Sequence, residues 1–431
     1  MTTSRDVFRK YDEYVITSFA KKIEPIAIVE GKGALVKDLD GNEYLDCFSG
    51  ISVANTGHCH EKVVRAIKEQ AERLLHCCTY VYHVAPAAEL AEKLAGIAPL
   101  GLQKTFFSNS GAEAIECAIK MGRKFTKRHE IIAVMCSFHG RTLGTLSVTG
   151  QWGRRRYDMG PYLSGVSFAP APYCYRCSLG QTYPDCKIRC AEIIEDIIEY
   201  SSSNDVAEFI AEPVLGEGGL IVPPPEYFKT VKKILDRHEI VFIVDEVQTG
   251  FGRTGKMFGI QHYGVTPDIM CLAKGIASGM PLGACMARAE IADSYEPGDH
   301  LSTFGGNPVC CAAGLATIEV MLEQDLSAQA SVKGEYLLKR LRELQTTESL
   351  IGEVRGKGLM IAVEMVEDQT TKTPAQEKAA KIKELMRMKG ILVGVGGVKA
   401  NVVRIQPPLV VTEQQLDTLV RHLAEALRQV R

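Results

Sequence analysis

The sequence lacks the features that would place it among membrane, secreted or polyanion-binding proteins. No run of apolar residues approaches the ~20 that a membrane-spanning helix needs, and the first residues have no apolar core like that of a signal peptide. Low-complexity tracts and internal repeats are also absent. The formal net charge of −2 implies no general surface for polyanions. We therefore expect a globular protein whose partners include neither a membrane nor a nucleic acid.

The composition is that of a globular protein, with 46% hydrophobic and 24% charged residues. The length of 431 residues is enough for two or three domains, or for one large domain with a smaller partner. Because no signal peptide accompanies the 14 cysteines, we expect them in a reducing cytoplasm, mostly as small buried thiols.

Two short apolar runs each end in a charged residue, and this pair organises the rest of the sequence. Asp245 follows the run Val241–Val244, and Lys274 follows Cys271–Ala273. Continuous apolar runs are typical of buried parallel strands, and ligands bind at the carboxyl ends of such strands. Pyridoxal 5'-phosphate (PLP) needs a lysine for its Schiff base and a carboxylate for its pyridinium nitrogen. The two residues therefore predict a PLP site.

A helix start further towards the N-terminus has the features of a phosphate site. A short apolar run leads into Ser110–Glu113, and apolar residues at helical spacing follow. Ser110 and Glu113 have the spacing of a capping box, and Gly111 and Ala112 leave the first-turn N–H groups unobstructed. Such a helix start binds a phosphate dianion well. An ordinary capped helix has the same pattern, so the phosphate interpretation depends on the aspartate and lysine.

Strand and helix patterns alternate from about residue 105 to 275, which predicts a mostly parallel sheet. Several polar or aromatic residues follow its strands. Phe138 could stack on a planar ring, whereas His139 beside it could be a site residue or a structural one. Glu212 ends a further strand, and Glu217 lies in the glycine-rich loop that follows.

The C-terminal part has a different pattern, which predicts a smaller α+β domain. We expect an N-terminal segment over residues 1–60 that packs with this small domain, a large domain over 61–325 and the small domain over 326–431. Arg404 lies in a strand before a Pro-Pro loop and suits bidentate carboxylate recognition, although a surface ion pair is equally compatible. Thr303 precedes a long helix and is a second candidate phosphate donor.

Residues 170–190 form a Pro- and Tyr-rich loop with two close cysteine pairs. Cys174 and Cys177 are followed by Cys186 and Cys190. Four thiols could hold a structural zinc ion or an iron–sulfur cluster. The gap between the pairs is shorter than in many zinc ribbons, and disulfides or packed thiols are the alternatives.

Two other classes of protein are disfavoured. Val241–Glu246 also resembles a Walker B strand, and Gly250–Lys256 nearly matches a P-loop. However, Met257 stands where a P-loop has its Mg²⁺-binding hydroxyl, and the order of the two motifs is reversed, which argues against an ATPase or kinase. A non-catalytic binding protein would leave Asp245 and Lys274 as costly buried charges.

Together these motifs resemble those of class III (ω-amino acid) aminotransferases, which are PLP enzymes of fold type I. The resemblance extends from Gly31 to the C-terminus. It implies an α/β fold with a large domain on a mostly parallel seven-stranded sheet and a smaller α+β domain. The motifs occur in the family's order: Ser110–Ala114, Phe138–Arg141, Glu212–Pro213, Asp245–Arg253, Ala273–Gly275 and Ser302–Pro308.

The resemblance implies a role for each cofactor-site residue. Lys274 would form the Schiff base and move a proton, and Asp245 would keep the pyridine nitrogen protonated. Gln248 would donate to the ring oxygen, and Phe138 would stack on the ring. The amides of the phosphate site would act with a threonine from a neighbouring subunit, so a homodimer or a dimer of dimers is expected. The remaining residues with cofactor roles are Ser110, Gly111, Ala112, Thr303 and, near the ring, His139 and Glu212.

The resemblance also implies how substrates are selected. In the branch that uses 4-aminobutyrate and ornithine, an acid at Glu217 pairs with the arginine at Arg404 and releases it when 2-oxoglutarate or glutamate binds. Leu215 departs from the glutamine common in that branch. Side chains near Ile51, Tyr80 and Tyr82 would contact the donor.

The expected reaction is transfer of an amino group from an ω-amino donor such as 4-aminobutyrate to 2-oxoglutarate. An amino-acid racemase of the same family, or an enzyme for ornithine, acetylornithine or alanine–glyoxylate, is the alternative. The spacing of Cys174 and Cys177 also resembles animal 4-aminobutyrate aminotransferases, where a two-cysteine motif helps to hold an iron–sulfur cluster between subunits.

Overall fold

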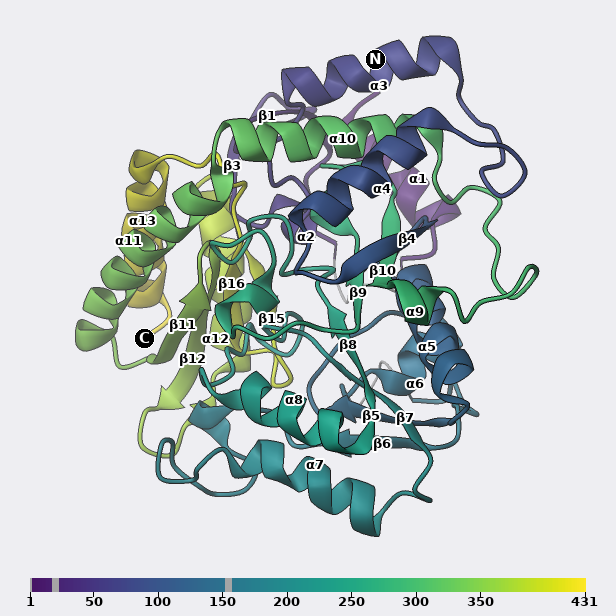
Figure 1. Ribbon diagram of the computed structural model, residues 1–431. Helices are drawn as coiled ribbons and strands as arrows, with labels where there is room; N and C mark the ends of the chain where they lie inside the picture. Colours follow the sequence, from purple (N-terminus) through teal and green to yellow (C-terminus); the bar gives the residue numbers. More distant parts are fainter. Residues whose placement is uncertain (1, 18–22, 152–156) are drawn as a thin grey trace.

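The computed structural model describes residues 2–17, 23–151 and 157–431. Its centre is a seven-stranded sheet in which β10 alone runs antiparallel to its neighbours β4 and β9, and all other neighbouring strands are parallel (Figure 1). The order across the sheet is β4 (Leu102–Ser108), β10 (Gly283–Arg288), β9 (Ile269–Leu272), β8 (Val241–Asp245), β7 (Val206–Ala211), β5 (Glu130–Val134) and β6 (Val166–Ala169). The expected α/β fold with a mostly parallel seven-stranded sheet is thereby confirmed.

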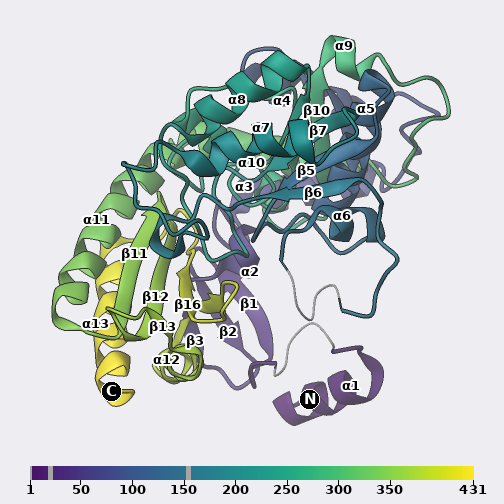
Figure 2. The ribbon, with the colours of Figure 1, turned by 90° about the horizontal axis from the view of Figure 1, so that it is seen from below.

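Helices cover both faces of this sheet, because alternate residues of its apolar strands point to opposite sides. On one face, Phe242 and Met270 pack with the helices of one large core cluster. On the other, Ile243 and Cys271 pack against α5 in a second cluster. Figure 2 shows α6 on one side of the sheet and α7 and α8 on the other. The helices around the sheet are α3 (Glu61–Arg73), α4 (Ala85–Ile97), α5 (Gly111–Thr126), α6 (Leu143–Val148), α7 (Arg189–Tyr200), α8 (Tyr227–His238), α9 (Ala289–Ala292) and α10 (Pro308–Glu323).

The C-terminal part forms an antiparallel sheet with helices on its outer side (Figure 2). Its strands are β11 (Ile351–Lys357), β12 (Met360–Asp368), β16 (Val402–Ile405) and β15 (Gly394–Gly396), and β13 (Thr373–Pro374) pairs with β12. Its helices are α11 (Leu326–Thr347), α12 (Gln376–Met388) and α13 (Glu413–Gln429). This sheet faces the large sheet across the segment between β7 and α8.

The N-terminal strands join the C-terminal part through strand pairing. The sheet order is β1 (Ile28–Lys32), β2 (Leu35–Asp38), β3 (Glu43–Asp46) and β14 (Ile391–Leu392), with β3 and β14 parallel. The chain starts with α1 (Ser4–Tyr14), and short turns of helix occur at α2 (Ser49–Ser52), η1 (Cys174–Arg176), η2 (Gly259–His262) and η3 (Lys274–Ile276).

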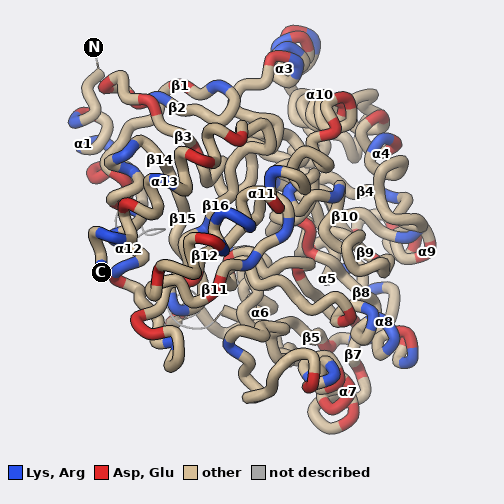
Figure 3. Tube along the Cα trace, turned by 90° about the vertical axis from the view of Figure 1, so that its left-hand side faces the viewer, with Lys and Arg blue, Asp and Glu red and all other residues tan. Residues whose placement is uncertain are grey.

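Charged residues of both signs occur throughout the described chain (Figure 3). Acidic and basic positions are interspersed along the trace (Figure 3), in keeping with the formal net charge of −2. None of the helices formed by the described residues combines the length and the apolar character that membrane crossing needs.

Glu208 on β7 is a buried carboxyl that faces α5. A Cβ atom at Gly122 of α5 would lie 1.9 Å from its Oε2 atom, and neither carboxyl oxygen has a hydrogen-bond partner among the described residues. Burial raises the pKa of Glu208 well above its ordinary value, so the folded protein keeps this proton to a higher pH than the unfolded chain does.

We predict that Glu208→Gln makes stability less sensitive to pH. Above pH 4.5, the ordinary pKa of the side chain, the unfolded chain loses a proton that the folded chain keeps. The wild type should therefore lose about 1.4 kcal/mol of stability per pH unit in this window as the pH rises, and the variant should not. Measuring Tm against pH, with the exposed Glu69→Gln as control, tests this expectation. A Tm difference that does not change with pH would contradict it.

Candidate active site

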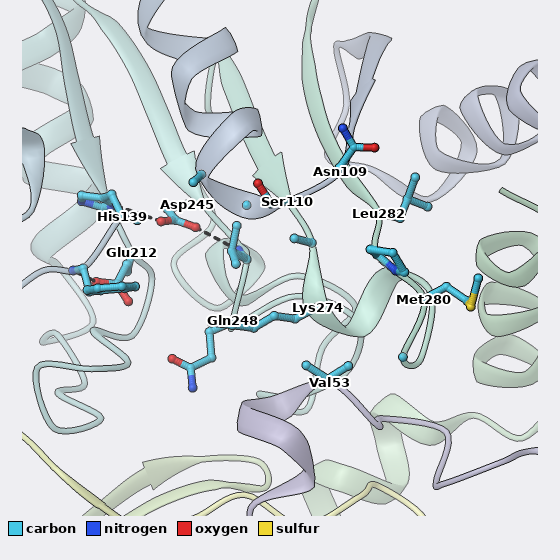
Figure 4. Close-up of a pocket in the computed structure, with 18 residues that line it drawn as sticks. Val53, Asn109, Ser110, His139, Glu212, Asp245, Gln248, Lys274, Met280 and Leu282 are labelled. Carbon is cyan, nitrogen blue, oxygen red and sulfur yellow. Dashed lines mark hydrogen bonds and ion pairs between the residues drawn. The ribbon is translucent and has the colours of Figure 1, made fainter. Parts of the chain in front are cut away.

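A cavity of about 380 Å³ opens at the carboxyl ends of β8 and β9. Motifs that are far apart in the sequence meet there, because the strand order places their ends side by side. In Figure 4, His139, Asp245, Ser110 and Lys274 surround one space. Nine of the residues predicted from the sequence line it: Ser110, Gly111, Ala112, Phe138, His139, Glu212, Asp245, Gln248 and Lys274.

Asp245 is the last residue of β8 and is almost completely buried. Its Oδ2 atom lies 2.8 Å from Nδ1 of His139, and its Oδ1 atom accepts the N–H of Val247 at 3.0 Å. An imidazole that donates to this carboxylate orients it. His139 thereby fixes the position of Asp245 from the loop after β5, which is separated from β8 in the sheet by β7.

Lys274 begins the short turn η3 directly after β9, with a backbone φ of +47°. This left-handed conformation is uncommon for a residue with a side chain and is found most often at functional sites. Burial lowers the pKa of the amine, and the nearby carboxylates of Asp245, Glu217 and Glu212 act in the opposite direction. A larger share of the amine is therefore neutral, as a nucleophile requires.

The start of α5 has unused backbone donors. Ser110 is the N-cap, and its Oγ atom accepts the N–H of Glu113 at 3.2 Å. The expected capping box is only half formed, because the Glu113 carboxylate accepts the N–H of Asn109, at 2.6 Å, instead of the N–H of Ser110. Among the hydrogen bonds of the described residues, none uses the N–H groups of Gly111 or Ala112. A Cβ at Gly111 would lie 2.8 Å from Val247 Cγ1, so the turn needs this glycine.

Glu212 connects two backbone segments that border the cavity. Its carboxylate accepts the N–H of Phe138 at 2.9 Å and the N–H of Gly216 at 2.8 Å. Burial raises its pKa to about 7. The residue therefore positions both the aromatic ring beside the cavity and the loop that carries Glu217.

The cavity fits PLP by its donor set. Asp245 offers a buried carboxylate for a protonated ring nitrogen, and Lys274 offers an amine. Among the described residues, Gln248 Nε2 and His139 Nε2 are buried without a hydrogen-bond partner, which leaves polar atoms for a bound group to satisfy. The helix start described above suits a phosphate.

Glu217 and Arg404 lie beside this cavity without lining it. They form an ion pair whose side chains are 14% and 6% exposed. The Arg404 guanidinium also lies over the ring of Phe48, 5.2 Å from its centroid. Both charges act on the pKa of Lys274, so the pair is within electrostatic reach of the amine.

Three other predicted residues lie outside the cavity of this single chain. Thr303, Ile51 and Tyr80 are exposed. The segments around Thr303 and Tyr80 pack against each other, since Thr79 Oγ1 donates to Gly305 O at 2.7 Å. The role assigned to Thr303 across a subunit boundary stays a prediction.

The expected metal site in the cysteine-rich loop is not borne out. Cys174, Cys177, Cys186 and Cys190 are free thiols that line one small cavity. Within residues 2–17, 23–151 and 157–431, no three Cys, His, Asp or Glu side chains are arranged to hold a metal ion. Burial raises the pKa of Cys190 to about 12, which opposes the thiolate form that metal binding requires.

Six residues that line the cavity lie outside the motifs predicted from the sequence: Val53, Asn109, Gly279, Met280, Pro281 and Leu282. Asn109 directly precedes the phosphate motif, and its position in that turn is a usable signal. The other five are glycine or apolar residues outside helices and strands, and no sequence pattern marks them.

Comparison with known proteins gives consistent matches over nearly the whole chain. The family model described as aminotransferase class-III matches residues 18–427. A leucine/methionine racemase of Thermococcus litoralis is 43% identical, covering 99% of this chain and 96% of that protein. An acetylornithine aminotransferase of Methanopyrus kandleri is 42% identical with 97% of each covered, and a probable 4-aminobutyrate aminotransferase of Bacillus subtilis is 37% identical with 97% of each covered.

Solved structures of similar fold include transaminases. A thermostable (S)-enantioselective ω-transaminase from Thermomicrobium roseum superimposes with a TM-score of 0.93 at 35% identity, covering 100% of this chain and 99% of that one. An amine transaminase from an uncultivated Pseudomonas species, in its PLP-bound form, has a TM-score of 0.91 at 34% identity, covering 96% and 98%.

We predict that Lys274→Ala abolishes covalent trapping of PLP by borohydride, because the variant lacks the amine that attacks the aldehyde. The measurement is the mass of the protein after PLP loading and reduction. Lys256→Ala is the matched control, since Lys256 is an exposed lysine from the near-match to a P-loop. Trapping that persists in Lys274→Ala would remove Lys274 from this role.

Proposed function

The chain belongs to the class III aminotransferase family of PLP-dependent enzymes, and from this premise we propose that it moves an amino group from an ω-amino donor such as 4-aminobutyrate to 2-oxoglutarate. The observation that carries this proposal is the buried pair of Glu217 and Arg404 beside Lys274. A homodimer and a cytoplasmic location remain further predictions of the same proposal.

PLP, when bound, supplies an electron-accepting ring that stabilises negative charge on the carbon bearing the amino group. The chain's own residues supply the rest. Lys274, whose pKa burial lowers, would take up the proton from that carbon and deliver it to the cofactor. Asp245, oriented by His139, would hold the ring nitrogen protonated. Gln248 would donate to the ring oxygen through its unpaired Nε2 atom.

Transamination between these two substrates makes opposite demands on one site. In 2-oxoglutarate a carboxylate is bonded directly to the reacting carbon, whereas in 4-aminobutyrate the carboxylate lies three carbons from the amine. A fixed cation near the reacting carbon would favour the first substrate and would stand unpaired beside the second. A cation that is paired with an acid, and that this acid can release, suits both substrates.

Arg404 and Glu217 have the properties that such a switch requires. The pair is largely buried, so separating it without a replacement would leave an uncompensated charge at a cost of several kcal/mol. An incoming α-carboxylate can take the place of Glu217 and can bind the guanidinium in a bidentate way. The ion pair between Glu217 and Arg404 stays intact when the donor carries no carboxylate at its reacting carbon.

Racemisation of an apolar α-amino acid is the second candidate function. It is favoured by the 43% identity to a leucine/methionine racemase and the 38% identity to an isoleucine 2-epimerase of Lentilactobacillus buchneri. The chemistry differs in one step, because Lys274 would return the proton to the substrate carbon instead of transferring it to the cofactor. Acetylornithine, named for a relative at 42% identity, is a further donor that suits the proposed reaction.

We predict that Arg404→Ala lowers kcat/KM for 2-oxoglutarate by about 10- to 100-fold, the usual loss of one hydrogen-bonded charge contact. The half-reaction with 4-aminobutyrate should fall much less, because the pair is closed in that step. Each half-reaction is followed separately by the cofactor absorbance. An equal loss in both half-reactions would contradict the switch.

We also predict that the PLP-loaded protein produces no D-leucine from L-leucine when no 2-oxo acid is present. A transaminase stops after one amino group per cofactor, whereas a racemase turns over without an acceptor. Chiral chromatography after long incubation measures the product. D-leucine in large excess over active sites would favour the racemase over the proposed aminotransferase.

A further inference from the structure

The turn that carries Glu217 is held at both ends. The N–H groups of Gly219 and Leu220 donate to Gly216 O at 3.2 and 3.1 Å, so Glu217 lies within a closed turn. At its first end, Glu212 accepts the N–H of Gly216. At its second end, Arg355 donates to the carbonyl oxygen of Gly219 from Nη2, at 2.6 Å, and from Nε, at 3.2 Å.

Arg355 and Arg404 lie at the same level of the C-terminal sheet. Arg355 on β11 pairs with Ala362 on β12, and Ala362 pairs with Arg404 on β16. Directly paired residues point to the same face of a sheet. The small Ala362 side chain between the two arginines packs in one cluster with Leu220 of the turn. One arginine thus binds the backbone of the turn, and the other binds the carboxylate that the turn presents.

Two carboxylates prevent Arg355 from competing for Glu217. Its Nη1 atom donates to Glu364 Oε2 at 2.6 Å and also to Glu353. The side chains of Arg355 and Glu364 are 9% and 0% exposed, so their charge-assisted hydrogen bond is shielded from water. The guanidinium fork is therefore divided between carboxylates on one side and backbone carbonyls on the other.

Glu364 also accepts hydrogen bonds from two residues at the start of the cysteine-rich loop. The Tyr173 hydroxyl and the Arg176 guanidinium both donate to its carboxylate, and the Arg355 guanidinium lies over the Tyr173 ring, 4.9 Å from its centroid. The loop whose thiols form no metal site thus contacts the support of the Glu217 turn. The side chains of Glu364 and Arg355 thus link a peripheral loop to the turn that carries Glu217.

We propose that Arg355 is a positioning residue for substrate selection, which holds the Glu217 turn so that Glu217 covers Arg404, and that Tyr173 supports it through Glu364. This inference rests on the proposed switch. When an α-carboxylate binds, only the Glu217 side chain has to leave, because Arg355 and Glu212 keep its backbone in place. Loss of the Arg355 contacts lets the turn move and uncovers Arg404 in the absence of substrate.

The test uses glutarate, a dicarboxylate with no reacting group, and its Kd for the PLP-loaded protein by calorimetry. Arg355→Lys keeps the charge but cannot serve two carbonyls and two carboxylates at once. We expect it to bind glutarate about tenfold more tightly than the wild type, because no energy is spent on displacing Glu217. Glu217→Gln should tighten binding similarly, and the double variant should gain no more than either single one.

The direction of the change in glutarate affinity distinguishes a positioning role of Arg355 from general damage to the site, because damage would weaken binding. Tyr173→Phe, with all charges retained, should tighten glutarate binding by a smaller factor in the same direction. Tyr175→Phe is its control, since the Tyr175 hydroxyl has no hydrogen-bond partner among the described residues. Tighter binding in Glu217→Gln with unchanged or weaker binding in Arg355→Lys and Tyr173→Phe would overturn the inference. Unchanged binding in Glu217→Gln would instead overturn the switch itself.

Discussion

The burial of a carboxylate and an amine at one edge of a single sheet is the constraint on which the rest of the structure depends. Charges removed from water are costly unless partners replace the lost solvation. Asp245 has His139 and a backbone N–H as such partners, whereas Lys274 has a lowered pKa. The surrounding elements either stabilise these two groups or keep polar atoms free for the cofactor, as Gln248 does.

Substrate selection depends on a second charge pair, held by a different part of the molecule. Glu217 belongs to the loop after β7, and Arg404 belongs to the C-terminal sheet. Both parts meet in a small apolar cluster that includes Leu220 and Ala362. Because the acid and the arginine come from separate elements, their contact is sensitive to how the turn is held. Arg355 is the residue that connects the turn to the sheet.

Much of the cofactor site could be predicted from the sequence because each residue belongs to a local motif with its own physical logic. Asp245 and Lys274 end apolar strands, and Ser110 precedes a helix. The four thiols of the cysteine-rich loop do line one cavity, but among the described residues they are not arranged to hold a metal ion, and close spacing in the sequence cannot show that difference. Thr303 and Tyr80 could not be placed at the cavity of one chain. Arg355 belongs to none of the predicted motifs. Its proposed role depends on the strand register that places it level with Arg404, and only the folded structure provides that register.

The visible absorption of the PLP-loaded protein, recorded before and after 4-aminobutyrate is added without an acceptor, tests the central claim most directly. We expect the PLP band to disappear and to be replaced by the spectrum of the aminated cofactor. We expect 2-oxoglutarate then to restore the original band. A PLP band that 4-aminobutyrate leaves unchanged would contradict the proposed donor, and a protein that shows no such band after loading would contradict the site itself.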